Sequence, residues 1–234
     1  MTMRRDLSMK ISAGIVDSGA SAAQAKYIHM GRCFLPGGRD LKPDRLGHGT
    51  TICDIIRHYA PDIRLYNAQV FDRQGVTSAA VVASAIDWLV MKKVDVINLS
   101  LGLKEDRPVL RIACDKAVAS GAILVASSPA QGTLTYPAAY EGVIRTTGDA
   151  RCAMGEISFL DSRQADFGGC PRDIGRGEGH PPRLGGASVG AAHISGQVAA
   201  FLQDGGDMTA IREWLISQAK YIHNEHRGAN KDNA

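Results

Sequence analysis

The sequence has no long apolar segment and no strong excess of charge of either sign. Its 234 residues carry 27 Lys and Arg against 24 Asp and Glu, so the formal net charge is only +3 at pH 7. So small an excess gives no reason to expect binding to nucleic acid or to an anionic membrane surface. No apolar run reaches the roughly 20 residues that a helix needs to cross a bilayer. We therefore expect no nucleic acid and no membrane among the partners of this protein.

Cysteine is scarce and irregularly placed. The five cysteines are an odd number, lie far apart and form no Cys-x-x-Cys pair. That pattern favours reduced thiols in a cytoplasmic protein over a disulfide framework or a zinc site. The first sixteen residues contain no sustained apolar segment and no small-residue cleavage site, so they do not predict a signal peptide. No carboxylate cluster suggests calcium binding, and we expect no metal and no cofactor.

The sequence does contain a regular alternation of strand-like and helix-like segments. Strands are predicted over 11–16, 62–71, 94–102, 122–128 and 142–148, and helices over 76–91, 108–120, 185–202 and 208–219. Such alternation indicates a mainly parallel sheet with helices on both faces. Residues 20–46 are predicted to be surface loop, and residues 151–184 mostly loop or short irregular strands. We expect one α/β domain over 11–222, an N-terminal extension over 1–10 and a polar tail over 223–234.

An aspartate follows the first predicted strand. Residues 11–16 read ISAGIV, and Asp17, Ser18 and Gly19 come next. Open α/β sheets place their ligand sites at the carboxyl ends of strands, which makes Asp17 a candidate site residue. Asp, Ser and Gly also favour turns, so the residue types taken alone favour a turn residue at Asp17 over a site residue.

A histidine stands between two glycines at the start of a helix-like run. Residues 47–49 read Gly-His-Gly, and isoleucines with helical spacing follow at 52, 55 and 56. Glycine lets other backbone or a substrate come close to the imidazole of His48. Histidine is the natural proton carrier near neutral pH. A capping or loop histidine is the alternative interpretation.

A serine lies near the start of the helix-like segment over 185–202. Gly185 and Gly186 precede it, and Ile194, Val198 and Phe201 recur at helical spacing, which predicts a buried helix. A hydroxyl in the first turn of a helix faces unpaired N–H groups and the positive end of the helix dipole. Such groups stabilise a carbonyl oxygen that becomes an anion. The alternative is that Ser188 is an N-cap, because serine is a favoured capping residue.

The order Asp17, His48, Ser188 and the residues around them match a known pattern. The blocks IVDSG (15–19), GHGT (47–50), INLSLG (97–102) and GAS (186–188) resemble four signature blocks of the subtilisin-like serine proteases. The resemblance covers about residues 11–222. It implies that family's mainly parallel sheet flanked by helices, and it implies hydrolysis of peptide bonds through an acyl-enzyme.

The resemblance also implies roles for individual residues. Ser188 would attack a peptide carbonyl, His48 would carry its proton to the leaving amine, and Asp17 would orient the imidazole. An extended peptide substrate would lie against a further group of residues, which comprises Ser100, Leu101, Gly102, Ser127 and Thr135. Thr135 falls where the family often has a glycine at the base of the first specificity pocket. A shallow pocket is therefore predicted, with preference for a small residue before the cleaved bond.

The chain departs from the family pattern where an asparagine side chain donates to the oxyanion. Ala130 falls at that position, and Ala187 precedes the serine where threonine is usual. The backbone N–H of Ser188 would remain as a donor. Gln131 and Ser128 are the candidates for a replacement side chain, on position alone.

Three functions remain open from the sequence. The first is a serine endopeptidase inside the cell that trims a particular precursor peptide or protein. The second is a protease-derived binding or scaffold protein without useful catalysis, which Ala130 and Ala187 favour. The third is a peptide ligase or other acyl transferase on the same scaffold. The partners expected are a peptide or protein substrate and a partner protein that completes or directs the site.

Overall fold

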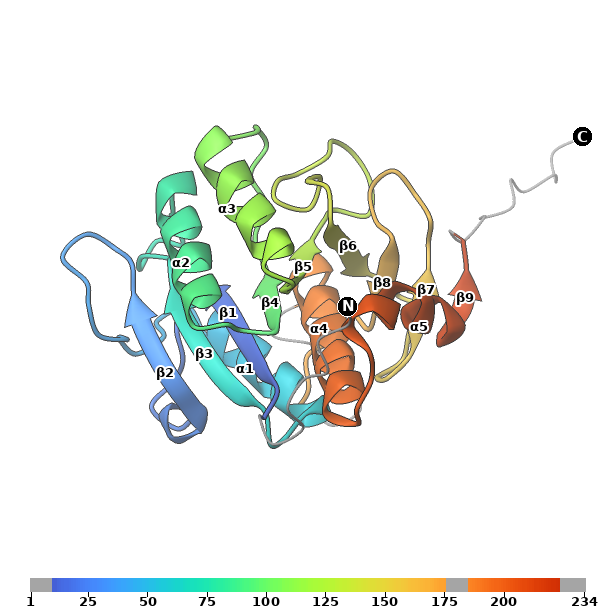
Figure 1. Cartoon of the computed structure of the whole chain (residues 1–234), viewed down its shortest axis with the longest axis horizontal. Coiled ribbons are helices and arrows are strands. Elements are labelled where there is room, and N and C mark those ends of the chain that lie inside the picture. The colour runs from blue at the N-terminus through green and yellow to red at the C-terminus, as the bar shows by residue number, and fades with distance from the viewer. Residues whose placement is uncertain (1–9, 176–184, 224–234) are drawn as a thin grey trace, which may run out of the picture.

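The computed structural model describes residues 10–175 and 185–223. These residues form a nine-stranded sheet with helices on both faces (Figure 1). The strand order is β2-β3-β1-β4-β5-β6-β8-β7-β9, and β7 pairs with β8 in the antiparallel sense while the other pairings are parallel. The predicted α/β class with a mainly parallel sheet is confirmed. The division into extension, domain and tail stays a prediction, because residues 1–9 and 224–234 lie outside the described residues.

The predicted strands and helices are present with somewhat narrower bounds. The strands are β1 Ser12–Asp17, β2 Ile28–Cys33, β3 Arg64–Gln69, β4 Val96–Leu99, β5 Ile123–Ser127, β6 Val143–Gly148, β7 Ile157–Phe159, β8 Phe167–Gly169 and β9 Ala219–Ile222. The helices are α1 His48–Tyr59, α2 Ala79–Met91, α3 Pro108–Ala119, α4 Ala187–Gln203 and α5 Ile211–Ser217, with 3-10 turns η1 Ala25–Tyr27 and η2 Met208–Ala210. Helix α2 begins three residues later than predicted because Ser78 caps it by accepting from the N–H of Val81.

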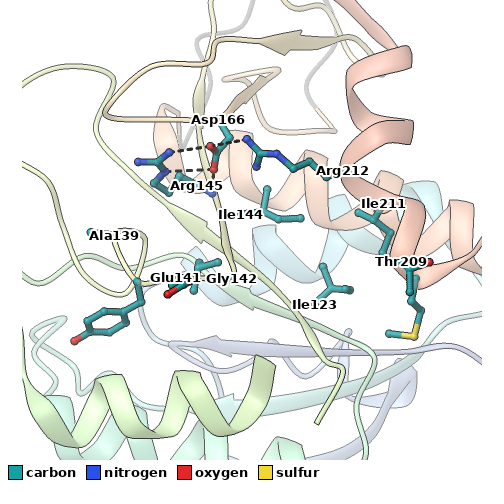
Figure 2. Close-up of a pocket in the computed structure, with 13 residues that line it drawn as sticks. Ile123, Ala139, Glu141, Gly142, Ile144, Arg145, Asp166, Thr209, Ile211 and Arg212 are labelled. Carbon is teal, nitrogen blue, oxygen red and sulfur yellow. Dashed lines mark hydrogen bonds and ion pairs between the residues drawn. The ribbon is translucent and has the colours of Figure 1, made fainter. Parts of the chain in front are cut away.

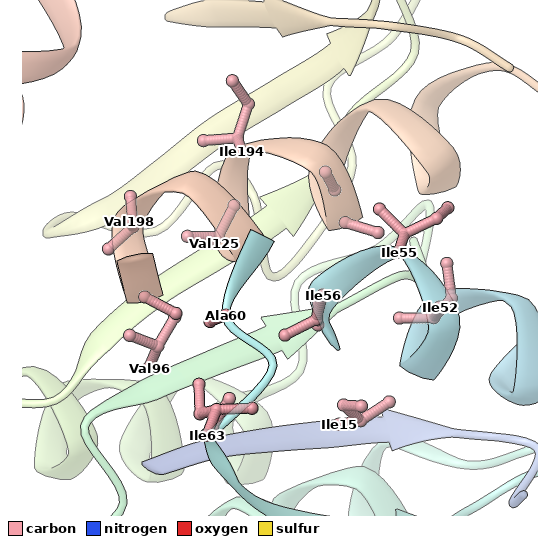
Figure 3. Close-up of a cluster of buried hydrophobic side chains, with 14 of the residues drawn as sticks. Ile15, Ile52, Ile55, Ile56, Ala60, Ile63, Val96, Val125, Ile194 and Val198 are labelled. Atoms are coloured by element: carbon pink, nitrogen blue, oxygen red, sulfur yellow. The ribbon is translucent and has the colours of Figure 1, made fainter. Parts of the chain in front are cut away.

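Two apolar clusters fill the space between the sheet and the helices. On one face, α1 and α4 pack on the central strands, and Figure 3 shows Ile52, Ile55, Ile56, Ile194 and Val198 against Ile15, Val96 and Val125. On the other face, α2 and α3 cover the neighbours of those strand residues, such as Val16, Ile97 and Ala126. Successive strand residues alternate between the two clusters, as the pleat of a sheet requires. Strands buried on both faces read as the continuous apolar runs that made them predictable.

Two edge strands were missed by the sequence prediction. Residues 28–33, predicted to be loop, form β2 and pair with β3 only. Residues 219–222, predicted as the end of a helix and the last residues of the domain, form β9 and pair with β7 only. Both strands are largely solvent-accessible, so they lack the apolar run of a central strand. Within the described ranges, no helix is both long enough and apolar enough to cross a membrane.

A pocket of about 490 Å³ opens at the edge of the sheet where β5 and β6 begin, opposite the carboxyl ends of the strands. In its wall, Asp166 accepts hydrogen bonds from Arg145 on β6 and from Arg212 on α5 (Figure 2). Burial alone would raise the pKa of Asp166, but the hydrogen bonds and charge of Arg145 and the hydrogen bond of Arg212 lower it overall. The Asp166 carboxylate therefore connects the segment just before β8 to β6 and to α5.

We predict that Asp166→Asn lowers the free energy of unfolding by about 2 kcal/mol at pH 7, because it removes a buried charge from two guanidinium partners. A lowered pKa in the folded state means that this stability is present above the ordinary carboxyl pKa and is lost as the pH falls through the folded value. Urea unfolding at pH 7 and pH 3 measures it, and the two proteins should converge in acid. The control is Asp87→Asn, which breaks an exposed pair with Lys116 and should cost under about 0.5 kcal/mol. A constant difference between pH 3 and pH 7 would contradict the prediction.

Candidate active site

His48 is the first residue of α1 and faces the end of β1. Its Nδ1 lies 2.8 Å and 2.9 Å from the two carboxylate oxygens of Asp17. A carboxylate accepts hydrogen bonds only, so the Nδ1 proton donates to Asp17 and Nε2 is left as the acceptor. That tautomer is the one a general base needs, because Nε2 can then take a proton from a nucleophile.

The glycines around His48 have separate functions in the fold. Gly47 has φ 77°, a left-handed conformation that glycine adopts without strain, and it starts the helix. At Gly49, a Cβ atom would lie 2.3 Å from the carbonyl oxygen of Gly19 and 3.2 Å from Asp17. The absence of that side chain lets the turn after β1 press against α1. The sequence predicted a close approach here, and the structure identifies the approaching group as the backbone of Gly19.

The surroundings of His48 favour its protonated form. Burial lowers the pKa of the imidazole, but the hydrogen bond and charge of Asp17, with the charge of Asp44, outweigh it and raise the pKa overall. The Asp17 side chain is fully buried, whereas that of His48 is 24% exposed. The His48 ring, paired with Asp17, can therefore take up a proton on its partly exposed side.

Ser188 is the second residue of α4, and it does not cap the helix. The N-cap is Gly186, and no side chain caps this end. The capping interpretation is therefore wrong. In the described ranges, the Ser188 hydroxyl donates to the carbonyl of Ser100 at 3.3 Å and makes no hydrogen bond with His48. In return, the Ser100 hydroxyl donates to the Ser188 carbonyl at 3.2 Å.

The sheet register gathers these residues at one edge. In the parallel pairing of β1 with β4, Val16 lies opposite Leu99, so Asp17 and Ser100 follow side by side at the carboxyl ends of the two strands. His48 is bound to Asp17 and Ser188 to Ser100, so all three candidate catalytic residues lie at this edge. Parallel α/β sheets place their sites at this edge.

A buried polar chain that the sequence analysis missed lies behind Ser188. The hydroxyl of Ser195 donates to the Asn98 side chain at 3.0 Å, and Asn98 donates to the Ser100 hydroxyl at 2.8 Å. Asn98 and Ser195 are both fully buried. The signal available in the sequence was an asparagine within an apolar strand, since a buried amide requires partners.

The first turn of α4 offers free backbone donors. Within the described parts of the chain, the N–H groups of Ala187, Ser188 and Val189 have no hydrogen-bond partner, as is usual for the start of a helix. They can stabilise a negative oxygen near the Ser188 hydroxyl.

The proposed replacement side chains after β5 are placed less favourably. Ala130 and Gln131 are exposed, and Gln131 makes no side-chain hydrogen bond to any described residue. Ser128 is buried, and its hydroxyl has no partner among the described residues. Its N–H still pairs with Thr146, so alternation puts its side chain on the Ala126 face, away from α4. This position weighs against Ser128 as an oxyanion donor, while Gln131 stays a prediction.

In the segment expected to bind substrate, the backbone of Gly102 is free, within the described ranges, to pair with a peptide, but the Thr135 side chain packs against it. The backbone N–H and C=O of Gly102 have no hydrogen bond to described residues, whereas the Leu101 carbonyl accepts from the Ser127 hydroxyl at 3.4 Å. A Cβ at Gly102 would lie 3.1 Å from the Cβ of Thr135, so the threonine side chain packs directly on this backbone. Thr135 therefore fills space beside the substrate strand.

The chain matches the family profile described as Peptidase S8, subtilase family, over residues 20–233. It belongs to the subtilase family. This subtilase is 29% identical to subtilisin DY of Bacillus licheniformis over 230 residues, which are 89% of the chain and 83% of that protein. Several other subtilisins are longer, and the chain spans 61% of their length. The predicted family is confirmed, and with it the class of a serine protease, a hydrolase of peptide bonds.

Two solved structures have the same fold as this subtilase. A cold adapted subtilisin-like serine proteinase aligns with a TM-score of 0.71 at 19% identity, over 92% of this chain and 86% of that one. A structure titled a lanthipeptide protease aligns with a TM-score of 0.66 at 16% identity, over 87% of this chain and 78% of that one.

In the part of the subtilase that the structure describes, no three His, Cys, Asp or Glu side chains converge as they would around a metal ion.

We predict that Gly49→Ala separates His48 from Asp17, because the new methyl group overlaps the Gly19 carbonyl and neither backbone can yield easily. The free energy of unfolding should fall by about 1–3 kcal/mol. The low-field proton resonance of the hydrogen-bonded Nδ1–H of His48 should disappear. The control is Gly47→Ala, whose methyl group meets no atom within 4 Å and adds only left-handed strain of about 1 kcal/mol. Persistence of the resonance in Gly49→Ala would contradict the prediction.

Proposed function

We propose that this subtilase is an endopeptidase in which Ser188 is the nucleophile, His48 the general base and then the general acid, and Asp17 the partner of the imidazole. The observation that carries the proposal is the arrangement at the sheet edge: Nδ1 of His48 bonds the buried Asp17 carboxylate, and Ser188 lies in the open first turn of α4. Among the described residues, this combination supplies a base with an unpartnered Nε2, a hydroxyl and unpaired N–H groups at one edge of the sheet.

The proposed reaction begins when the Ser188 hydroxyl leaves the Ser100 carbonyl and turns to Nε2 of His48. His48 takes the hydroxyl proton as Oγ attacks the carbonyl carbon of the peptide, and the carbonyl oxygen becomes an anion facing the N–H groups of α4. The C–N bond then breaks as His48 gives the proton to the leaving amine. Water repeats the sequence on the acyl-enzyme and releases the acid and the free Ser188 hydroxyl.

The proposed substrate is a particular precursor peptide or protein with a small residue before the cleaved bond. Thr135 beside Gly102 supports the small residue, and Ala130 in place of a donor side chain supports a slow enzyme with one dedicated substrate. A protein titled a lanthipeptide protease has the same fold, which is compatible with this role but concerns the fold alone. The proposed location is the cytoplasm, because all five cysteines are buried free thiols.

Two other functions compete with this proposal. Ala130 and Ala187 favour a binding or scaffold protein that has lost catalysis, whereas no function other than catalysis requires Asp17, His48 and Ser188 together. A peptide ligase or other acyl transferase would use the same acyl-enzyme but pass it to an amine. A partner protein that completes or directs the site fits each of the three.

Labelling with a fluorophosphonate tests the proposal, because this probe forms a bond with an activated serine. We expect one label per chain, mapped to Ser188 by mass spectrometry. Ser188→Ala and His48→Ala should abolish labelling, while Ser84→Ala, an exposed serine on α2, should leave it unchanged. No label on the folded wild-type chain, under conditions where an ordinary subtilisin reacts fully, would favour the binding protein. An amine adduct on an acyl-enzyme formed from an ester substrate would favour the ligase.

We predict that Thr135→Gly widens substrate preference. Removing the side chain that packs on Gly102 deepens the pocket, so cleavage after Phe or Leu should rise by about tenfold or more relative to cleavage after Ala. Rates on peptides that differ only at the residue before the cleaved bond measure the change. Thr133→Gly is the matched control, since Thr133 is exposed. A preference of the wild-type enzyme for large aromatic residues would contradict the prediction of a shallow pocket.

We also predict that Ala130→Asn increases turnover, because it restores an amide donor at the position where the family has one. Such a donor contributes on the order of a hundred- to a thousandfold in kcat, a figure that comes from a subtilisin. The gain should be in kcat with little change in KM. Ala130→Leu, similar in size but without a donor, is the control. Equal rates for the two variants would mean that this position does not face the oxyanion.

A further inference from the structure

Asp44 lies in the loop before α1 and accepts five hydrogen bonds. Its Oδ1 accepts from the Ser18 hydroxyl and from the N–H groups of Leu46 and Gly47, each at 2.9 Å. Its Oδ2 accepts from the N–H of Thr50 at 2.9 Å and from the Thr50 hydroxyl at 2.7 Å. These donors belong to the turn after β1, to the loop that leads into α1 and to the first turn of α1.

These contacts run parallel to the Asp17–His48 pair. Ser18 directly follows Asp17, and its hydroxyl also accepts from the N–H of Gly49, the residue after His48, at 2.9 Å. Asp44, Ser18 and Gly49 therefore form a second connection between the end of β1 and the first turn of α1. Disturbing it would change the angle at which the imidazole meets the Asp17 carboxylate.

Asp44 also brings charge to His48. The charged groups that act on the imidazole are Asp17, from β1, and Asp44, from the loop. Helix α4 and the end of β4 bring the uncharged Ser188 and Ser100 to this edge. Hydrogen bonds to Thr50, Gly47 and Ser18 offset the effect of burial and lower the pKa of Asp44, so it is ionised at neutral pH. An anion at the N-terminus of α1 is also favoured by the helix dipole.

We propose that Asp44 is a positioning residue for acyl transfer in this protein, one that clamps the His48 turn to the Asp17 turn and stabilises the imidazolium formed in the reaction. The proposal rests on the proposed function of His48 as the base. It assigns two separable effects to one carboxylate, namely the clamp through Ser18 and the charge felt by the ring.

The charge is tested by the pH dependence of fluorophosphonate labelling and by an NMR titration of the His48 ring. In Asp44→Asn, both midpoints should move to lower pH, and the labelling rate at the plateau should fall about tenfold. Asp54→Asn is the matched control. It also removes one negative charge from the α1 region, but Asp54 contacts Gln24 and not the turn that carries His48. Equal midpoints for the two variants would overturn the role of the charge.

The clamp is tested by Ser18→Ala, which keeps both carboxylates. Its labelling rate should fall severalfold while the midpoints move less than in Asp44→Asn, and thermal unfolding checks that the chain is folded. A wild-type rate in Ser18→Ala would overturn the clamp. The NMR titration needs no catalysis, so it reports on Asp44 even if the wild-type protein does not label and the proposed function fails. Should Asp44→Asn not fold, Asp44→Glu, which keeps the charge but lengthens the reach, should behave like Ser18→Ala.

Discussion

The hydrogen bond between Asp17 and His48 is the interaction on which the rest of the site depends. A carboxylate that is fully buried is costly unless it is paired and hydrogen-bonded, and Asp17 satisfies this need through the His48 ring and the N–H of Ser18. The pairing requires α1 to begin at the very edge of the sheet. Gly49 makes that approach sterically allowed, and Asp44 holds it from the other side.

Ser188 is held at the edge of the sheet by a different set of constraints. A Cβ at Gly190 would lie 2.2 Å from the Thr147 carbonyl, so the first turns of α4 press against the end of β6. The hydrogen bonds between Ser100 and Ser188 connect the first turn of α4 to the end of β4, and the bond from Ser195 to Asn98 connects a later turn to the same strand. His48 and Ser188 are thus held at the sheet edge by different contacts.

The sequence predicts those parts of the fold in which local pattern and burial agree. Central strands such as β1 and β4 are apolar throughout and were predicted, whereas β2 and β9 lie at the edges, are half solvated, and were missed. The order and local motifs of the three site residues were readable because each stands within two residues of a glycine in a short motif. Asp44 and Asn98 were not identified, because their importance lies in hydrogen bonds to residues that only the folded chain brings near. The hydrogen bond of Ser188 to Ser100 depends likewise on a side-chain rotamer that no sequence pattern specifies.

The burial of all five cysteines has a consequence for how opening of this protein can be followed. Burial raises the pKa of Cys114 to about 12 and that of Cys152 to about 11, so these two thiols carry little thiolate at mildly alkaline pH. A thiol reagent in the solvent therefore finds no exposed thiol on the native protein. Cys53 is a buried residue of α1 and Cys114 a buried residue of α3, and the two helices cover opposite faces of the sheet. The order in which these two sulfurs become modified records which layer of helices lifts from the sheet first.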